Sequence, residues 1–257
     1  MQLDYRQYST SGEPVLILHG LFGSHSNWGW HAKELAARFA VTGVDLRNHG
    51  GSPHAEIMNY QIMAEDIQEL LQRLDIESCS IIGHSMGGKV AMELSLRYPQ
   101  LVSKMIVVDI APVAYEDSAD VHMRAIAGME SLDLEKINSR TEAQDYLRNF
   151  IHDESTRQFV LTNLVREKSG RYRWRLNLPA IKKEYDNLRA EPSGNKVFRK
   201  PVLFIKGALS NYIKIEYEQQ ILKFFPKATS KIIMEGGHWL HAEKPQVFNK
   251  IAMSFLS

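Results

Sequence analysis

The chain has 257 residues, of which 44% are hydrophobic and 24% are charged, and its formal net charge is +1. This composition excludes a disordered, collagen-like or disulfide-stapled protein. Because 31 basic residues nearly balance 30 acidic ones, no net charge attracts the protein to nucleic acid or to an anionic membrane.

Two further features bear on where the protein resides. The single cysteine, Cys79, cannot form an internal disulfide or a paired-cysteine metal site, which fits a reducing compartment. Residues 1–14 lack the apolar core of a signal peptide, and no stretch approaches the roughly 18–20 apolar residues of a membrane span. We therefore expect a cytoplasmic protein without a membrane span and without a nucleic-acid partner, and its oligomeric state stays open.

Six short apolar runs recur along the chain, and Gly or a polar residue follows each of them. They cover residues 14–18, 40–44, 80–82, 104–108, 201–205 and 231–234. Each run is too short for a helix and most are rich in Val and Ile, so the pattern predicts buried strands.

Amphipathic stretches with helical spacing lie between these runs. The apolar residues of 63–74 fall on one helical face, residues 90–98 form a second helical pattern stopped by Pro99, and 245–255 begin with a proline. Alternating strands and helices with apolar strands predict an α/β fold, in which helices cover both faces of a doubly wound, mostly parallel sheet.

The alternation stops between residues 111 and 200. This stretch has helical patterns at 120–129 and 141–151 but no convincing buried strand. A structureless loop of that length would be unusual in a compact domain. We therefore expect an inserted helical cap at 111–200, on a core formed by residues 1–110 and 201–257.

A basic run within this insertion spans residues 166–175 and interleaves arginines with aromatic residues. Such a run could bind single-stranded nucleic acid. The alternation of Arg171 and Arg173 with Tyr172 and Trp174 instead favours a two-faced segment that packs its aromatic rings.

The segment Gly83-His84-Ser85-Met86-Gly87 matches the pattern GxSxG. It directly follows a predicted strand and opens a predicted helix, the setting that a nucleophile elbow requires. The sharp turn needs small residues at Gly83 and Gly87, and it lifts the Ser85 hydroxyl clear of the sheet at the positive end of the helix. The alternative is that Ser85 is an ordinary helix cap.

A serine nucleophile needs a base, and His238 is the best candidate among ten histidines. It follows the last predicted strand, and the carboxyl ends of parallel strands meet at one crevice. His238 should therefore lie near Ser85. His241 is the competing base, although packing is its more natural role, and the alternative for His238 is a loop histidine beside the last helix.

The acid that holds the base is less evident. The loop after the penultimate predicted strand, residues 207–211, has no Asp or Glu, and Ser210 stands where an Asp is expected. Asp109 lies directly past the preceding strand, so we expect it to be the acid, with Ser210 as an extra hydrogen-bond partner of His238. Glu235 or Glu243 could orient His238 instead.

Acyl transfer also needs hydrogen-bond donors for the developing oxyanion. The Gly-rich turn at 19–23 follows the first predicted strand, which places the backbone N–H of Leu21 opposite that of Met86. The sequence has no dinucleotide or P-loop motif and no metal-binding pattern such as HExxH, so we expect neither a cofactor nor a metal.

Five segments together resemble the α/β-hydrolase superfamily and, within it, the YbfF-type bacterial esterases. They read HGLFGS, DLRNHGGSP, GHSMGGK, VVDIAPV and GGHWLHAEKP. The resemblance implies an eight-stranded, mostly parallel sheet with a helical cap between strands six and seven, and a cofactor-free esterase that forms an acyl-enzyme.

Carried over residue by residue, the resemblance implies Ser85 as nucleophile, His238 as base and Asp109 as acid. Leu21 and Met86 match the oxyanion positions. Ser210 matches a serine that this group has in place of the superfamily's usual Asp.

We therefore expect a serine carboxylesterase that acts on small-molecule acyl esters. An acyl-CoA thioesterase is the nearest alternative, because the same machinery serves thioesters. A catalytically silent ligand-binding protein and a hydrolase of C–C bonds are the others considered, and the serine at position 85 disfavours a dehalogenase.

Overall fold

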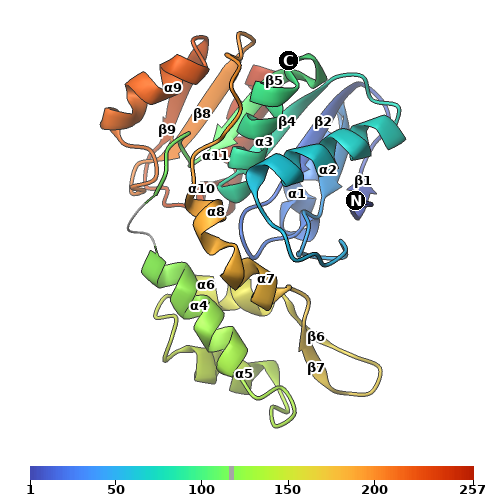
Figure 1. Ribbon diagram of the computed structural model, residues 1–257, viewed down its shortest axis with the longest axis vertical. Helices are drawn as coiled ribbons and strands as arrows, with labels where there is room; N and C mark the ends of the chain where they lie inside the picture. The colour runs from blue at the N-terminus through green and yellow to red at the C-terminus, as the bar shows by residue number, and fades with distance from the viewer. Residues whose placement is uncertain (116–118) are drawn as a thin grey trace.

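The computed structural model describes residues 1–115 and 119–257, and its core is a twisted sheet with helices on both faces (Figure 1). Within these residues the sheet has seven strands in the order β1-β3-β2-β4-β5-β8-β9. The strands are β1 (Tyr5–Gln7), β2 (Glu13–Leu18), β3 (Phe39–Val44), β4 (Cys79–His84), β5 (Val102–Val108), β8 (Val202–Gly207) and β9 (Ala228–Ile233).

Only β1 runs antiparallel to its neighbour, β3, and the other adjacent strands pair in parallel. The expected mostly parallel sheet is therefore confirmed, but the described sheet has seven strands instead of eight. The residues ahead of β2 contribute a single three-residue strand at this edge. The long insertion accordingly lies between the fifth and sixth strands of this sheet, not between the sixth and seventh.

Side chains of successive strand residues point to opposite faces, which gives the sheet two apolar layers. Val15 and Ile17 of β2 pack in one cluster, whereas Leu16 and Leu18 pack in the other. Helices α1 (Gly29–Leu35), α10 (Leu240–Glu243) and α11 (Pro245–Leu256) cover the first layer; α2 (Tyr60–Arg73), α3 (Met86–Arg97) and α9 (Glu218–Phe224) lie on the second. Short 3-10 turns occupy His25–Trp28, Pro99–Leu101 and Ile215–Tyr217.

The segment between β5 and β8 lies beside the core, at the bottom of Figure 1. It contains α4 (Ala119–Ser131), α5 (Arg140–Leu147), α6 (Glu154–Leu161), α7 (Leu178–Lys183), α8 (Tyr185–Arg189) and the hairpin β6 (Leu164–Arg166) and β7 (Tyr172–Trp174). We call residues 111–200 the inserted segment. It is mainly helical, as expected, and the hairpin pairs only with itself in the described residues.

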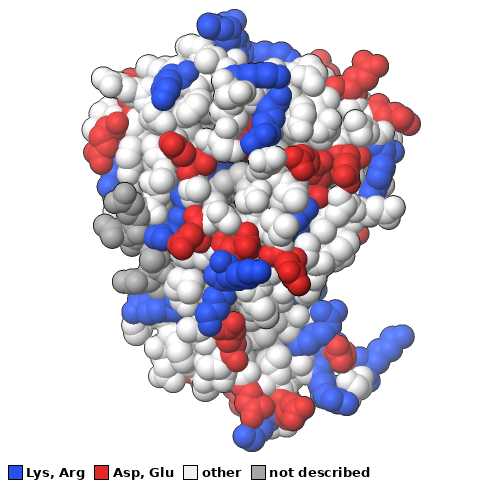
Figure 2. All heavy atoms as spheres, viewed as in Figure 1, with Lys and Arg blue, Asp and Glu red and all other residues white. Residues whose placement is uncertain are grey.

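The hairpin has the two faces that its sequence predicts. Arg171 and Arg173 are exposed, whereas Tyr172 and Trp174 are half-buried, and the Trp174 Nε1–H donates to the Met129 carbonyl of α4 at 2.9 Å. Lys and Arg side chains gather over this hairpin at the lower right of Figure 2, and both signs intermingle over the rest of that face. Separately, every helix in the described ranges is too short or too polar to cross a bilayer.

Helix α3 joins the sheet to both ends of the inserted segment. Lys89 is buried, and its Nζ donates to the carbonyls of Val113 at 2.7 Å and Arg189 at 3.1 Å, and to that of Ala190. One turn further along α3, the buried Glu93 accepts hydrogen bonds from Ser193. A single helix face therefore fixes the point where the insertion leaves the core and the point where it returns.

Candidate active site

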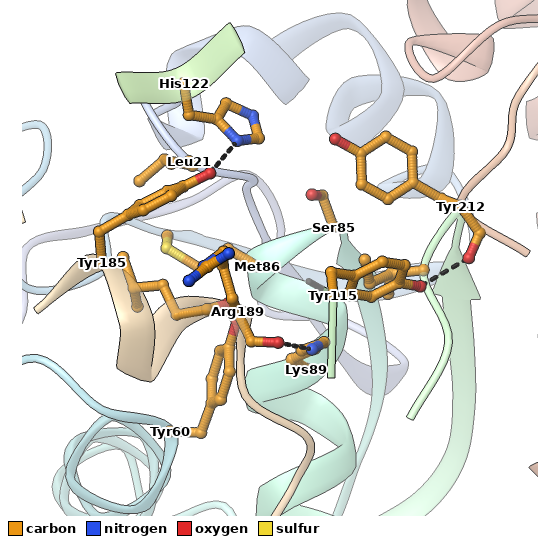
Figure 3. A pocket seen from close by; sticks show the side chains of 12 residues that line it. Leu21, Tyr60, Ser85, Met86, Lys89, Tyr115, His122, Tyr185, Arg189 and Tyr212 are labelled. Carbon is orange, nitrogen blue, oxygen red and sulfur yellow. Dashed lines mark hydrogen bonds between the residues drawn. The ribbon is translucent and has the colours of Figure 1, made fainter. Parts of the chain in front are cut away.

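Ser85 occupies the turn between β4 and α3 in a backbone conformation that side chains rarely adopt, with φ 51° and ψ −116°. The turn is crowded. A Cβ atom on Gly83 would overlap the Gly87 carbonyl, and one on Gly87 would overlap the Leu18 carbonyl. Only glycine fits at these two positions. The strained backbone of Ser85 itself is typical of a functional site. The Ser85 hydroxyl points into a hollow, toward the gap between His122 and Tyr212 (Figure 3).

Asp109 and His238 lie together, although they follow β5 and β9, the two strands on either side of β8. The His238 Nδ1 atom is 2.8 Å from Asp109 Oδ2, and Asp109 is fully buried. Asp109 has a positive φ of 52°, its N–H donates to Ile205, and its Oδ1 accepts from the Gly207 N–H at 3.1 Å. The carboxylate is therefore held against the imidazole by the backbone of β8.

The hydrogen-bond partner of Ser210 differs from the expected one. Its hydroxyl donates to Asp109 Oδ2, not to His238. The loop after β8 turns back on itself, with the Ser210 N–H donating to the Gly207 carbonyl at 3.1 Å, so the hydroxyl ends beside the carboxylate. The two alternative acids have other partners: Glu235 pairs with Lys244 at 2.7 Å, and Glu243 accepts from the Gly237 N–H at 2.6 Å.

The imidazole of His238 is fixed from several sides. The Tyr212 ring stacks on it, with centroids 4.0 Å apart, and the His84 Nε2 atom lies 2.9 Å from the His238 carbonyl oxygen. Among the described contacts Ser85 and His238 share no hydrogen bond. Catalytic hydrogen bonds are often long without substrate and tighten when it binds.

Leu21 and Met86 line the same hollow as Ser85. Neither N–H has a protein acceptor among the described hydrogen bonds. His49 supports the turn, because its Nε2 accepts from the Phe22 N–H at 3.2 Å, and Phe22 has a φ of 63°. An oxyanion site requires N–H groups of this kind, held in place and without a protein acceptor.

Other histidines near the strand ends are neutral supports. Burial lowers the pKa of His19 to about 4 and that of His49 to about 3, and it also lowers the pKa values of His84 and His241. His241 is buried and stacks on Trp28, with centroids 4.3 Å apart and planes 3° apart. It therefore packs in the core, as its sequence position favours.

Two hollows lie at the site, and Ser85 lines only the first. The first has a volume of about 40 Å³ and includes Ser85, Met86, Lys89 and Leu188 in its lining. The second has a volume of about 300 Å³, and its lining includes His238 of the core loops. Three residues line both: Leu21, His122 and Tyr212.

Sequence reasoning missed the pocket walls. His122 donates to or accepts from the Tyr185 hydroxyl at 2.8 Å, and burial lowers its pKa to about 4. Trp239 packs on Phe159 of α6, with centroids 4.3 Å apart. Nearness to a predicted site residue was the available signal for two of them: Tyr212 lies two residues after Ser210, and Trp239 directly follows His238.

One group of side chains in the described residues could supply three metal ligands. Asp4, His25 and Asp45 have ligand atoms within 4.8 Å of one another. The Asp45 carboxylate, however, already accepts hydrogen bonds from the N–H groups of His25 at 2.6 Å and Gly51 at 2.8 Å. The group fits a backbone-stabilising role.

Comparisons with known proteins give the family of the chain. A family model described as alpha/beta hydrolase fold matches residues 13–128. The sn-1-specific diacylglycerol lipase ABHD11 of Danio rerio is 38% identical over 100% of this chain and 83% of its own length. The chain belongs to the α/β-hydrolase family.

Two further members are esterases by name. Esterase YbfF of Escherichia coli is 33% identical to this α/β-hydrolase, over 98% of this chain and 96% of the relative. A solved structure named marine microorganism esterase is 41% identical, covers 99% of each chain and superposes with a TM-score of 0.97. This α/β-hydrolase is a carboxylic ester hydrolase.

Proposed function

We propose that the protein hydrolyses carboxylic esters through an acyl-enzyme formed on Ser85, with His238 as base and Asp109 as the acid that holds it. The observation that carries this proposal is the 2.8 Å contact between His238 Nδ1 and the fully buried Asp109, beside a serine on a strained turn. A buried carboxylate on Nδ1 keeps Nε2 free to accept a proton.

The reaction follows from these positions. His238 Nε2 takes the Ser85 proton while Oγ bonds to the ester carbonyl carbon, and the N–H groups of Leu21 and Met86 stabilise the oxyanion. The imidazolium then protonates the leaving alcohol as the C–O bond breaks. Water repeats the sequence with His238 as base, which releases the acid and restores Ser85.

Ser210 enters this proposal through Asp109. A hydroxyl that donates to Asp109 Oδ2 supports the ionised carboxylate and fixes its orientation toward His238. The group acts as a positioning residue that never touches the substrate.

The division of the chain also belongs to this proposal: a core of residues 1–110 and 201–257, with residues 111–200 as a cap. Its support is that α4 and α6 supply Val121, Ala125 and Phe159 to the wall of the larger hollow. A cap built in this way selects substrates without taking part in proton transfer.

A burst experiment tests the proposal. Wild-type enzyme mixed rapidly with a p-nitrophenyl ester should release p-nitrophenol equal to the enzyme concentration before the steady state, if deacylation is the slower step. Mass spectrometry of quenched enzyme should find the acyl group on Ser85. The folded Ser85→Ala variant should show neither signal, and an acyl group on another residue would contradict the assignment.

Matched oxygen esters and thioesters with the same acyl group separate the esterase from the thioesterase. We expect a higher kcat/KM for the oxygen ester. A cytoplasmic location is a further proposal, supported by the single, buried Cys79. Cell fractionation tests it.

A further inference from the structure

The two hollows share three lining residues but differ in volume and in their relation to the reacting groups: Ser85 lines only the smaller one, and His238 lines only the larger one. In the tetrahedral intermediate the carbon carries four groups: Ser85 Oγ, the oxyanion, the leaving oxygen and the acyl chain. The leaving oxygen must lie beside His238, because the imidazolium protonates it. The oxyanion faces Leu21 and Met86, so the acyl chain takes the remaining direction.

His238 lines the larger hollow and is absent from the lining of the smaller one. Resting on the proposed function, we propose that the 40 Å³ hollow holds the acyl chain and that the 300 Å³ hollow holds the leaving alcohol. The protein is then selective for esters of short acids with bulky, apolar alcohols.

The smaller hollow is closed at its far end by groups whose hydrogen bonds are already made. The Tyr60 hydroxyl donates to the Leu188 carbonyl, and the Tyr115 hydroxyl donates to the Tyr212 carbonyl at 2.6 Å. The three Lys89 donors are taken by backbone carbonyls, one of them that of Val113. The lysine therefore has no donor left for a carboxylate or phosphate on the substrate. Arg189, the other cation in this lining, pairs with Asp186 at 2.6 Å, so the hollow fits an uncharged acyl chain.

Its volume sets the length of that chain. About 40 Å³ corresponds to roughly three water-sized spheres. An acyl chain of about two to four carbons fills this space, and a longer one would have to displace buried side chains such as Leu188.

The larger hollow accepts a different kind of group. Its wall comes from α4, with Val121 and Ala125, from Phe159 of α6, and from Phe22 and Trp239 of the core loops. The wall is mainly apolar and has no Lys, Arg, Asp or Glu among its lining residues. An uncharged aromatic or branched alkyl alcohol fits it.

Two substrate series test the assignment in the full-length protein. In the first, p-nitrophenyl esters carry acids of two to twelve carbons; we expect kcat/KM to fall at least tenfold between four and eight carbons. In the second, butyrate esters carry methyl, butyl, hexyl and benzyl alcohols; we expect kcat/KM to rise at least tenfold from methyl to benzyl. Each accommodated methylene should change kcat/KM by about threefold to fourfold.

A matched pair of variants separates the two hollows. Leu188→Ala enlarges the smaller hollow, so the preferred acid should lengthen by about two carbons while the alcohol profile stays unchanged. Val121→Trp fills the larger one from a position that is 55% exposed; benzyl butyrate should lose at least tenfold in kcat/KM while the acyl optimum stays unchanged. Thermal unfolding of each variant confirms that it is folded.

The outcomes are distinguishable. An active enzyme that prefers long acids, or whose acyl optimum moves with Val121→Trp and not with Leu188→Ala, overturns the assignment and leaves the proposed function standing. A folded wild type that hydrolyses no ester of either series, or a Ser85→Ala variant that stays fully active, overturns both.

Discussion

The loops at the strand ends and the inserted segment border the same pocket but are built differently. Ser85 and Asp109 are held by strained backbone and by hydrogen bonds to neighbouring strands. Val121, Ala125 and Phe159 of the inserted segment contribute mainly apolar surface. In the proposed mechanism the strand ends therefore hold the reacting groups, whereas the inserted segment supplies part of the pocket wall.

The largest expected effect tests the chemical side of this comparison. Replacing the base by His238→Ala should lower kcat by about 10³–10⁶, because removal of one member of such a unit removes the proton transfer. Steady-state hydrolysis of p-nitrophenyl butyrate measures it. The exposed His152→Ala of the inserted segment is the control and should keep wild-type activity; equal losses in both would contradict the assignment.

Asp109→Asn and Ser210→Ala compare how much Asp109 and Ser210 each contribute to the activity of His238. Asp109→Asn should lower kcat by about 10²–10⁴, because the amide favours the wrong tautomer of the His238 imidazole. Ser210→Ala removes one hydrogen bond to the carboxylate and should cost about tenfold. The pH dependence of kcat/KM should change in both variants, and a larger loss in Ser210→Ala than in Asp109→Asn would reverse the roles.

Acid stability tests the buried histidines that support the strand-end loops. The folded-state pKa values of His19 and His49, about 4 and about 3, lie below the ordinary value near 6.5. The unfolded chain therefore binds more protons between these values, and the free energy of unfolding should fall as the pH falls from about 6.5 to 3. The slope is at most about 1.4 kcal/mol per pH unit for each group.

Urea unfolding across this pH range, with His49→Gln beside the wild type, measures that contribution. The variant should have a shallower loss of stability below pH 6. The same pair at pH 7.5 gives the separate cost of altering the hydrogen bond to Phe22. Parallel slopes in the two proteins would show that His49 contributes nothing to the acid sensitivity.

The smallest expected effect on activity concerns the junctions of the inserted segment. Lys89→Met keeps a long side chain but leaves three part-buried carbonyls without their donor, so the free energy of unfolding should fall by roughly 2–4 kcal/mol. Activity should fall less than tenfold. Lys196→Met, which removes a single exposed bond to the Arg97 carbonyl, is the matched control and should change stability by about 0.5 kcal/mol or less.

Local signals made the core readable from the sequence. The six predicted strands and the helices after Ser85 and Pro245 occur within a few residues of their expected positions, because apolar runs and Gly or Pro boundaries act over short distances. Strand β1 was missed, since its three residues, one half-buried and two exposed, carry no such pattern. Helices α1 and α9 were also missed, being only seven residues each.

The residues of the site also differ in how far the sequence predicts their positions. Ser85, Asp109 and His238 follow strand ends, so topology alone predicts their proximity. The partner of Ser210 could not be predicted, because one turn of loop decides between two neighbouring acceptors. The walls given by His122 and Phe159 depend on how the inserted segment packs, and no spacing in the sequence encodes that arrangement.

The three carbonyls on Lys89 Nζ have a consequence for how such proteins diversify. Residues 113 and 190, at the two ends of the insertion, meet at one ammonium group, so their backbones are neighbours although 77 positions separate them. A segment whose two ends lie side by side can be replaced by another segment of the same kind. A transplanted segment would then keep this junction if its two ends presented carbonyl oxygens to Lys89 and a hydrogen-bond donor to Glu93.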